Sequence, residues 1–426
     1  MKICIKTLGC KVNAYESECI EEDFKNHGYE VVSDTNDADV IVVNTCTVTN
    51  QADAKSRKII RQARKNEKAC LVVCGCSSQH HKDSLFDLGV DILLGTDGKT
   101  KIFSLVEEYQ KNHEKISLFS DVRHSEFEST SINEMDGKTR AFVKIQDGCN
   151  NFCSYCIIPF VRGRVRSKDF DVAVNEINAL ANNGYKEVVL TGIHTGAYGE
   201  GENFDLTDLI HEISKNDNLL RVRISSIEIT QLNEKFMNEF KNNKKICSHI
   251  HVPVQCPNDE ILKGMNRKYT LDEYKAKIKE LRKTRDDVNI TTDLIVGFPG
   301  ETDEIFNSML DECVNIGFSK IHTFPYSIRK GTKASIMKQV KDSDKRDRVD
   351  KMLRLSDMLE NKYYNKYLGK TVTVLVEKNN TGFTSNYIKV HIDSDVPEGA
   401  LADVKITKVD GINVFGELIS VKKEAK

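Results

Sequence analysis

Short apolar runs alternate with longer stretches of helical periodicity along most of this 426-residue chain. The first runs lie at residues 3–8, 40–43, 70–73 and 92–94, and helical stretches separate them at residues 15–27, 52–65, 78–87 and 99–111. Strands buried in a parallel sheet are continuous apolar runs, and the intervening helices return the chain to the same edge. The pattern predicts an α/β fold in which residues 1–112 form a doubly wound parallel-sheet domain.

The alternation restarts after a polar stretch of weak periodicity at residues 113–138, which is expected to be an interdomain linker. Six further strands are expected at residues 141–145, 187–190, 221–225, 249–254, 289–296 and 320–326. Six β/α units predict an incomplete (β/α)6 barrel over residues 139–367, with its active site at the carboxyl ends of the strands.

The last part of the chain, residues 368–426, contains only short strand-like runs. They lie at residues 371–376, 381–385, 387–391, 402–407 and 414–418. Five short strands predict a small all-β barrel of the OB-like type, a shape that binds nucleic acid by stacking bases on aromatic side chains. Phe383 and Tyr387 are candidates for such stacking.

The composition limits the compartment and the partners. The 13 cysteines are an odd number in a chain without a secretory leader pattern, so we expect metal ligands or buried thiols rather than disulfides, and a cytoplasmic location. No run of about 18 apolar residues is present, so no membrane partner is expected. The formal net charge is −2, so nucleic-acid contacts require a local basic patch.

Three cysteines, Cys149, Cys153 and Cys156, form a C-x3-C-x2-C array. A structural zinc site closes its shell with four ligands, and a cubane 4Fe-4S cluster is usually held by four cysteines. Three thiolates on such a cluster would leave one iron open to an exogenous ligand. The alternatives are a structural metal site whose fourth ligand lies elsewhere, or three incidental buried thiols.

Three further cysteines, far apart in sequence, each follow a predicted strand. Cys10 follows the first strand through Gly9, Cys46 follows the second, and Cys76 follows the third. Because parallel strands share one carboxyl edge, the topology predicts that these cysteines converge in a second three-thiolate site. The cysteines in apolar patterns are expected to be small buried hydrophobes: Cys4, Cys19, Cys70, Cys247 and Cys313.

The array resembles that of the radical S-adenosylmethionine (SAM) enzymes, and Gly9-Cys10-Lys11-Val12-Asn13 resembles the N-terminal domain of the methylthiotransferases. The resemblance implies a fold ending in a TRAM domain, with SAM and two 4Fe-4S clusters as cofactors. In the family one cluster cleaves SAM and the auxiliary cluster serves sulfur delivery. The implied ligands are Cys149, Cys153 and Cys156 for the first cluster, and Cys10, Cys46 and Cys76 for the second. Two departures are Cys74, close to Cys76, and Cys256-Pro257 in place of Ser-Gly.

The resemblance also assigns SAM contacts to loops that follow the barrel strands. These residues are Tyr155, Gly192, Ser225, Glu228, Gln255, Asp293 and Gly297. Each loop motif alone is ordinary turn chemistry, but their order behind the array is specific. Arg162, Arg164 and Arg166 are interpreted as a lip for an anionic substrate beside a cavity shared by both triads, with solvated charge as the alternative. The basic stretch 52–68 is either a solvated helix face or a phosphate-binding strip.

The activity that the resemblance implies is methylthiolation of tRNA. The Gly9–Asn13 form and the motif at residues 191–196 favour N6-threonylcarbamoyladenosine at position 37, with replacement of the adenine C2 hydrogen by S–CH3. Alternative substrates are N6-isopentenyladenosine in tRNA and an aspartate of a ribosomal protein. A different class is a non-catalytic, metal-containing RNA-binding protein. The expected partners are a tRNA anticodon loop, a reducing electron donor and a sulfur source, without DNA, and no catalytic residue is expected beyond the cluster ligands.

Overall fold

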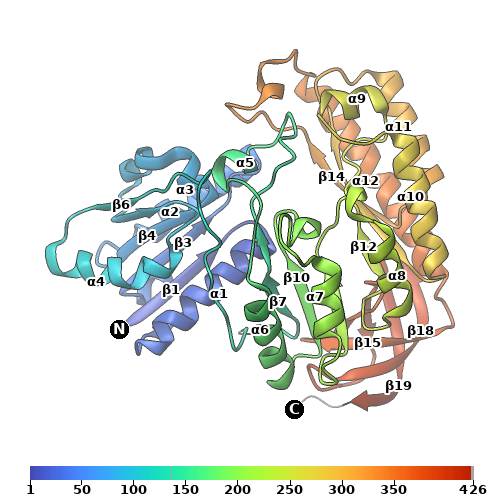
Figure 1. Ribbon diagram of the computed structural model, residues 1–426, viewed down its shortest axis with the longest axis horizontal. Coiled ribbons are helices and arrows are strands. Elements are labelled where there is room, and N and C mark those ends of the chain that lie inside the picture. The colour runs from blue at the N-terminus through green and yellow to red at the C-terminus, as the bar shows by residue number, and fades with distance from the viewer. Residues whose placement is uncertain (136, 424–426) are drawn as a thin grey trace.

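The computed structural model describes residues 1–135 and 137–423 and arranges them in three successive parts. Figure 1 shows the N-terminal part in blue and cyan beside an open barrel that runs from green to orange, with a small red barrel packed against one end of it. Within these residues, no helix combines the length and apolar character needed to cross a bilayer.

The N-terminal part is a six-stranded sheet in which every pair of neighbouring strands is parallel, in the order β2-β1-β3-β4-β5-β6. Its strands are β1 (Lys2–Thr7), β2 (Glu30–Val31), β3 (Val40–Thr45), β4 (Cys70–Gly75), β5 (Ile92–Leu94) and β6 (Ile116–Leu118). Helices α1 (Lys11–Asn26) and α4 (Ile102–Asn112) pack on one face. Helix α2 (Asn50–Ala63) and the 3-10 segment Lys82–Leu88 pack on the other.

Strand β6 lies within the segment that was predicted to be a linker. Ile116–Leu118 pairs with β5 as the sixth strand of the sheet, so the prediction that the linker begins at residue 113 is wrong for this stretch. Three residues are too few to give a periodic signal in the sequence. The two-residue strand β2 escaped prediction for the same reason.

The central part is an open barrel of six parallel strands taken in chain order. They are β7 (Ala141–Lys144), β10 (Glu187–Thr191), β11 (Arg221–Ile224), β12 (His249–His251), β13 (Asn289–Val296) and β14 (Lys320–Pro325). They form two three-stranded sheets, β11-β10-β7 and β12-β13-β14, joined by a bridge between Val222 and Ile246. All six predicted strands are present, and β12 is shorter than expected.

The helices of the central part cover the outside of the barrel. They are α6 (Phe170–Asn182), α7 (Leu206–Ile213), α8 (Glu234–Asn242), α10 (Leu271–Thr284) and α11 (Asp303–Ile316), followed by α12 (Asp342–Asn365). Their apolar faces and the strands share one buried core. N-terminal caps fix several helix starts, for example at Thr270, whose side chain accepts from the Glu273 N–H in a reciprocal capping box.

The C-terminal part is a closed barrel in the order β15-β16-β17-β19-β18. Its strands are β15 (Thr371–Glu377), β16 (Thr381–Thr384), β17 (Lys389–Ile392), β18 (Leu401–Asp410) and β19 (Asn413–Lys423). The turn after β16 docks on the amino ends of the central strands: Arg221 donates to the Phe383 carbonyl at 2.8 Å, and Asn289 donates to the Asn386 carbonyl at 2.7 Å. The closed five-stranded barrel was expected; the turn contact places it against the open barrel.

Candidate active site between the N-terminal sheet and the open barrel

Cys10, Cys46 and Cys76 follow the carboxyl ends of the neighbouring strands β1, β3 and β4. The three side chains lie close enough to influence one another electrostatically. Burial raises the pKa of the Cys76 thiol to about 11, although the charge of Arg162 acts in the opposite direction. The topology therefore gathers these cysteines as the sequence indicated, while their role as cluster ligands stays a prediction.

Gly9 permits the close approach of the first two of these cysteines. Its φ is +104°, and a Cβ built on it would lie 2.8 Å from Cβ of Cys46 and 3.1 Å from its Sγ. A side chain at this position meets both a strained backbone and a clash with Cys46.

Gly9→Ala is therefore expected to displace Cys46 from Cys10 and to lower the free energy of unfolding by about 1–3 kcal/mol. The lower value corresponds to backbone strain without the clash. Urea unfolding of the metal-free protein measures the loss. The matched control is Gly28→Ala, because Gly28 also has a positive φ of +80°, but a Cβ added there would meet no atom within 4 Å. Equal destabilisation by both variants would contradict the close approach at Cys46.

Arg162 is wrongly predicted as part of an exposed substrate lip. Its side chain is fully buried and bridges the N-terminal sheet and the barrel. Its Nε donates to Sγ of Cys76 at 3.2 Å, and its Nη2 donates to Oδ1 of Asn13 at 2.7 Å. Its Nη1 donates to Oδ2 of Asp147 at 2.9 Å. A guanidinium committed to these groups has no donor directed at solvent or at a substrate.

Arg166 and Arg164 differ from each other. The Arg166 side chain is largely buried and pairs with Asp97 at 2.9 Å, so it too departs from the predicted lip. Arg164 is exposed and lies over the Phe152 ring at 5.7 Å. Of the three predicted substrate contacts, Arg164 alone is accessible.

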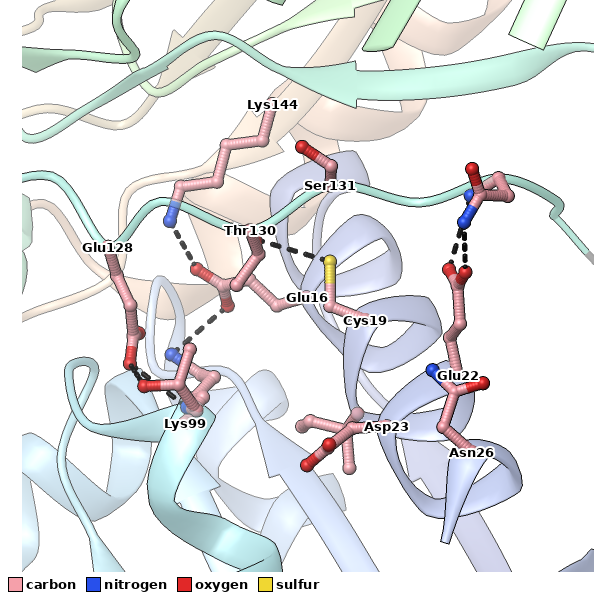
Figure 2. A pocket seen from close by; sticks show the side chains of 13 residues that line it. Glu16, Cys19, Glu22, Asp23, Asn26, Lys99, Glu128, Thr130, Ser131 and Lys144 are labelled. Carbon is pink, nitrogen blue, oxygen red and sulfur yellow. Dashed lines mark hydrogen bonds and ion pairs between the residues drawn. The ribbon is translucent and has the colours of Figure 1, made fainter. Parts of the chain in front are cut away.

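Glu16 on α1 joins the same buried network from the other side. It lies 2.8 Å from Nζ of Lys144, 3.2 Å from Nζ of Lys99 and 3.0 Å from Nη1 of Arg162. Figure 2 shows Glu16 between Lys99 and Lys144 in a pocket of about 320 Å³ that separates α1 from residues 128–133. Burial alone would raise the pKa of Glu16, but the surrounding cations, Arg162 first, hold it well below its ordinary value.

Arg162→Gln is expected to destabilise the protein by about 3–5 kcal/mol, because it leaves buried carboxylates without their principal cation. The folded-state pKa values of Glu16 and Asp147 are both depressed, so these groups stabilise the fold above their unfolded pKa values, about 4, and lose that stabilisation as the pH falls. The variant should therefore begin to unfold at a higher pH than the wild type in an acid titration followed by circular dichroism. Arg164→Gln, on the same loop but exposed, should match the wild type; equal behaviour of both variants would refute the network.

The cysteine array lies in the loop between β8 (Gln146–Asp147) and the short helix α5 (Ile158–Val161). The Cys149 N–H donates to the Gly163 carbonyl at 3.0 Å, and the Cys156 N–H donates to the Cys153 carbonyl at 3.0 Å. Burial and the neighbouring Cys153 raise the pKa of Cys149 to about 11 and that of Cys156 to about 12. The loop is thus a folded-back turn that holds three soft donors.

Each triad offers three thiols, the donor type that holds a 4Fe-4S cluster. Across residues 1–135 and 137–423, no three histidine, cysteine or acidic side chains converge as ligands of one metal ion. The thiolates of a cubane cluster bond different irons, so their sulfur atoms lie farther apart than the ligands of one ion. The donor set, three thiols on each side, matches that requirement.

Two residues assigned to SAM lie beside the array, together with an arginine that sequence reasoning missed. Arg267 pairs with Glu228 and donates to Sγ of Cys153 at 3.4 Å. Tyr155 is packed edge-on against Phe298, with ring centroids 6.4 Å apart. No sequence pattern marked Arg267, because it follows a short helix rather than a strand.

Two further residues assigned to SAM have backbone roles. Gln255, at φ +64°, donates its N–H to the Asp293 carbonyl at 2.9 Å and so ties the loop after β12 to β13. The Gly297 N–H donates to Glu301 at 2.8 Å, and a Cβ there would lie 2.4 Å from Cγ of Lys345. These residues shape the loops at the carboxyl ends of the strands.

A cavity of about 730 Å³, called the central cavity below, lies where the three parts of the chain meet. The N-terminal part contributes Cys10 and Lys11. The open barrel contributes Gly192, Ser225 and Asp293 among others, and the C-terminal barrel contributes Phe383 and Tyr387. The cysteines of the array and the three arginines after it are not among the lining residues. Of the two triads, Cys10 alone is among the residues described as lining this cavity, so a cavity shared by both triads stays a prediction. Lys11, Phe383 and Tyr387 line the cavity in place of the predicted arginines.

Cys74 and Cys256, the two departures from the family pattern, are core residues. Cys74 is fully buried in the apolar layer under α1, on the opposite face of β4 from the layer that holds Val73. Cys256 is fully buried, with Sγ 3.6 Å from Sδ of Met309. Neither thiol points into the central cavity.

Two family models match the chain: the Radical SAM superfamily over residues 143–313, and the Uncharacterized protein family UPF0004 over residues 2–95. A relative named threonylcarbamoyladenosine tRNA methylthiotransferase MtaB, from Bacillus subtilis (strain 168), is 38% identical over 438 aligned residues, covering 99% of this chain and 97% of the relative. The chain belongs to the radical SAM methylthiotransferase family. Its cofactors are SAM and two 4Fe-4S clusters.

Relatives whose names give different substrates are similar to this chain at comparable identity. The protein of the same name from Thermotoga maritima is 36% identical, covering 88% of this chain and 86% of its own length. A tRNA-2-methylthio-N(6)-dimethylallyladenosine synthase from Acetivibrio thermocellus is 33% identical, covering 98% and 90%. Among solved structures, the radical SAM methyltransferase TsrM from Kitasatospora setae superposes with a TM-score of 0.58 at 15% identity over 79% of this chain and 77% of that chain, which supports the fold.

Proposed function

We propose that this protein is a tRNA methylthiotransferase that converts N6-threonylcarbamoyladenosine at position 37 to its 2-methylthio derivative. The observation that carries the proposal is the central cavity, because it brings Cys10 of one triad together with Gly192, Ser225 and Asp293 at the barrel strands. The two relatives of highest identity reported above bear the threonylcarbamoyladenosine name. An adenine in a tRNA loop can be splayed into such a cavity without opening a duplex.

The cluster ligands follow from the two triads. In this proposal Cys149, Cys153 and Cys156 hold the cluster that binds SAM, and Cys10, Cys46 and Cys76 hold the auxiliary cluster. When bound, these groups and SAM supply the one-electron chemistry, the sulfur and the methyl group. The protein's own residues bind and orient the reactants and exclude water.

Named residues divide this positioning work. Tyr155 and Glu228, the latter fixed by Arg267, line the approach to the array. Gly192, Ser225 and Asp293 face the central cavity, while Gln255 and Gly297 hold the loops around it. Arg162 stabilises Cys76 by a hydrogen bond rather than contacting the substrate.

The proposed function extends to the domains and the partners of the protein. We infer a doubly wound N-terminal domain, a TRAM domain formed by the C-terminal barrel, and a cytoplasmic enzyme that binds the tRNA anticodon loop. Arg164 is the accessible arginine available for a phosphate contact beside the array. A reducing electron donor and a sulfur source complete the requirements of the reaction.

The test is mass spectrometry of tRNA nucleosides from cells with and without the gene. The proposal predicts that 2-methylthio-N6-threonylcarbamoyladenosine disappears and its unmethylthiolated precursor accumulates when the gene is deleted. The second candidate is the dimethylallyladenosine substrate, which relatives at 33% identity carry in their names. Loss of the methylthiolated dimethylallyl nucleoside, with the threonylcarbamoyl product unchanged, would replace the proposed substrate by this one.

A further inference from the structure

The central cavity contains a lysine that has no anionic partner of its own. Lys11 is the first residue of α1, directly after Cys10, and it lines the cavity. Within residues 1–135 and 137–423 it forms no ion pair with a carboxylate, and its main electrostatic neighbours are Tyr387, Arg140, Arg223 and Glu187. Burying a cation without a partner costs free energy, so an anion bound beside Lys11 would be stabilised.

The groups around Lys11 leave an excess of positive charge. Arg223 lies 2.6 Å from Glu187, and Arg140 and Arg221 lie 3.8 and 3.7 Å from the same carboxyl group. One carboxylate thus serves three arginines. Glu377 offsets Arg140 at 2.8 Å, and Lys11 shares the electrostatic influence of Glu187 with the three arginines without forming an ion pair of its own in the described part of the chain. Of these cations Lys11 lines the cavity; Asp293 and Glu360 line it as well, and Glu360 is paired with Lys320 at 3.0 Å.

Tyr387 forms the neighbouring wall and is held in a strained conformation. Its φ is +67°, a region that bulky residues rarely occupy and that is often retained at functional sites. Its ring is stacked between Phe383 and His249, with centroids 4.8 and 4.7 Å apart. Although burial raises it, the charges of Lys11 and Arg140 bring the pKa of Tyr387 below its ordinary value. Lys11 and Tyr387 thus line the same cavity and influence each other electrostatically.

We propose that Lys11, supported by Tyr387, binds the carboxylate of the substituent on N6 of the target adenosine and so determines which nucleoside is accepted. This inference rests on the proposed function. A threonylcarbamoyl group carries a carboxylate and a hydroxyl group, whereas a dimethylallyl group carries neither. The apolar substituent would leave the ammonium buried and unpaired, and sites with buried polar groups reject ligands that cannot pair with them.

Two other anions share this chemistry: an RNA phosphate and the carboxylate of SAM. Tyr387 of the C-terminal barrel is an electrostatic neighbour of Lys11, whereas the residues assigned to SAM follow the carboxyl ends of the strands. The position favours the substituent. The experiment separates the three sources.

The test measures binding of three anticodon stem-loops to the reconstituted holoenzyme. They carry threonylcarbamoyladenosine, its carboxyl methyl ester, or unmodified adenosine at position 37. Wild type and Lys11→Arg are expected to bind the acid about 10- to 100-fold more tightly than the ester, since a hydrogen bond to a charged group contributes about 1.5–3 kcal/mol. Lys11→Gln is expected to lose this preference while its iron content and SAM affinity stay at the wild-type level. Lys241→Gln, an exposed lysine on α8, is the matched control.

Each other outcome overturns the inference. Equal weakening for all three stem-loops would assign Lys11 to a phosphate, and weakening of SAM alone would assign it to the cofactor. A preference kept by Lys11→Gln, or absent in the wild type, would remove Lys11 from substrate selection. These results are distinct from failure of the proposed function, which appears as unchanged nucleosides after gene deletion.

Discussion

Replacing Cys149 with alanine is expected to abolish the reductive cleavage of SAM to 5′-deoxyadenosine. The array has three thiols, and the loss of one leaves too few ligands to hold a cubane cluster. The auxiliary triad lies on separate strands of another sheet, so it should still assemble. Iron analysis after anaerobic reconstitution should fall from about eight to about four atoms per chain, and chromatography should detect no 5′-deoxyadenosine.

The control for this variant is Cys313→Ala. Cys313 is fully buried in the barrel core on α11 and lies away from both triads. It should keep the full iron content and wild-type SAM cleavage. If Cys149→Ala still cleaved SAM, or if Cys313→Ala lost an equal amount of iron, the assignment of the array would be refuted.

Replacing Cys46 with alanine is expected to separate SAM cleavage from product formation. Cys46 directly follows β3 and lies next to Gly9. Cys76 directly follows the neighbouring strand β4 at the same edge of the sheet. The array is unaffected, so the variant should retain about four irons and still produce 5′-deoxyadenosine. It should form no methylthiolated nucleoside, because sulfur delivery requires the auxiliary site. Both products are measured in one reaction by mass spectrometry.

Cys70→Ala is the matched control for Cys46→Ala. Cys70 begins β4 at the edge of the sheet opposite to Cys76, and it is buried in the apolar layer under α1. Its variant should form the methylthiolated nucleoside. A product from Cys46→Ala, or its loss from Cys70→Ala with iron retained, would overturn the division of labour between the triads.

The strands and the gathering of the N-terminal cysteines follow from local patterns and one topological rule. A parallel sheet has one carboxyl edge, so Cys10, Cys46 and Cys76 had to lie on it once β1, β3 and β4 were recognised. Short strands such as β6 carry too few residues for a periodic signal. Their place in the sheet depends on pairing with β5, which no local pattern records.

The contacts between parts of the chain could not be predicted in the same way. Arg162 follows a cluster motif, and a basic residue there is ordinarily solvent-exposed; its burial depends on Asn13 and Glu16, which meet it only because α1 packs against the barrel. The presence of Lys11 and Tyr387 in one cavity depends on the docking of the C-terminal turn. Such contacts join residues far apart in sequence, and only the assembled fold shows them.

The central claim is tested most directly with the reconstituted protein and two tRNA substrates in one reaction. One tRNA carries threonylcarbamoyladenosine at position 37 and the other dimethylallyladenosine; SAM, a reductant and sulfide are supplied, and the nucleosides are analysed by mass spectrometry. We predict that the threonylcarbamoyl nucleoside gains a methylthio group and that the dimethylallyl nucleoside is unchanged. Conversion of the dimethylallyl nucleoside instead, or of neither while SAM is cleaved, would contradict this claim.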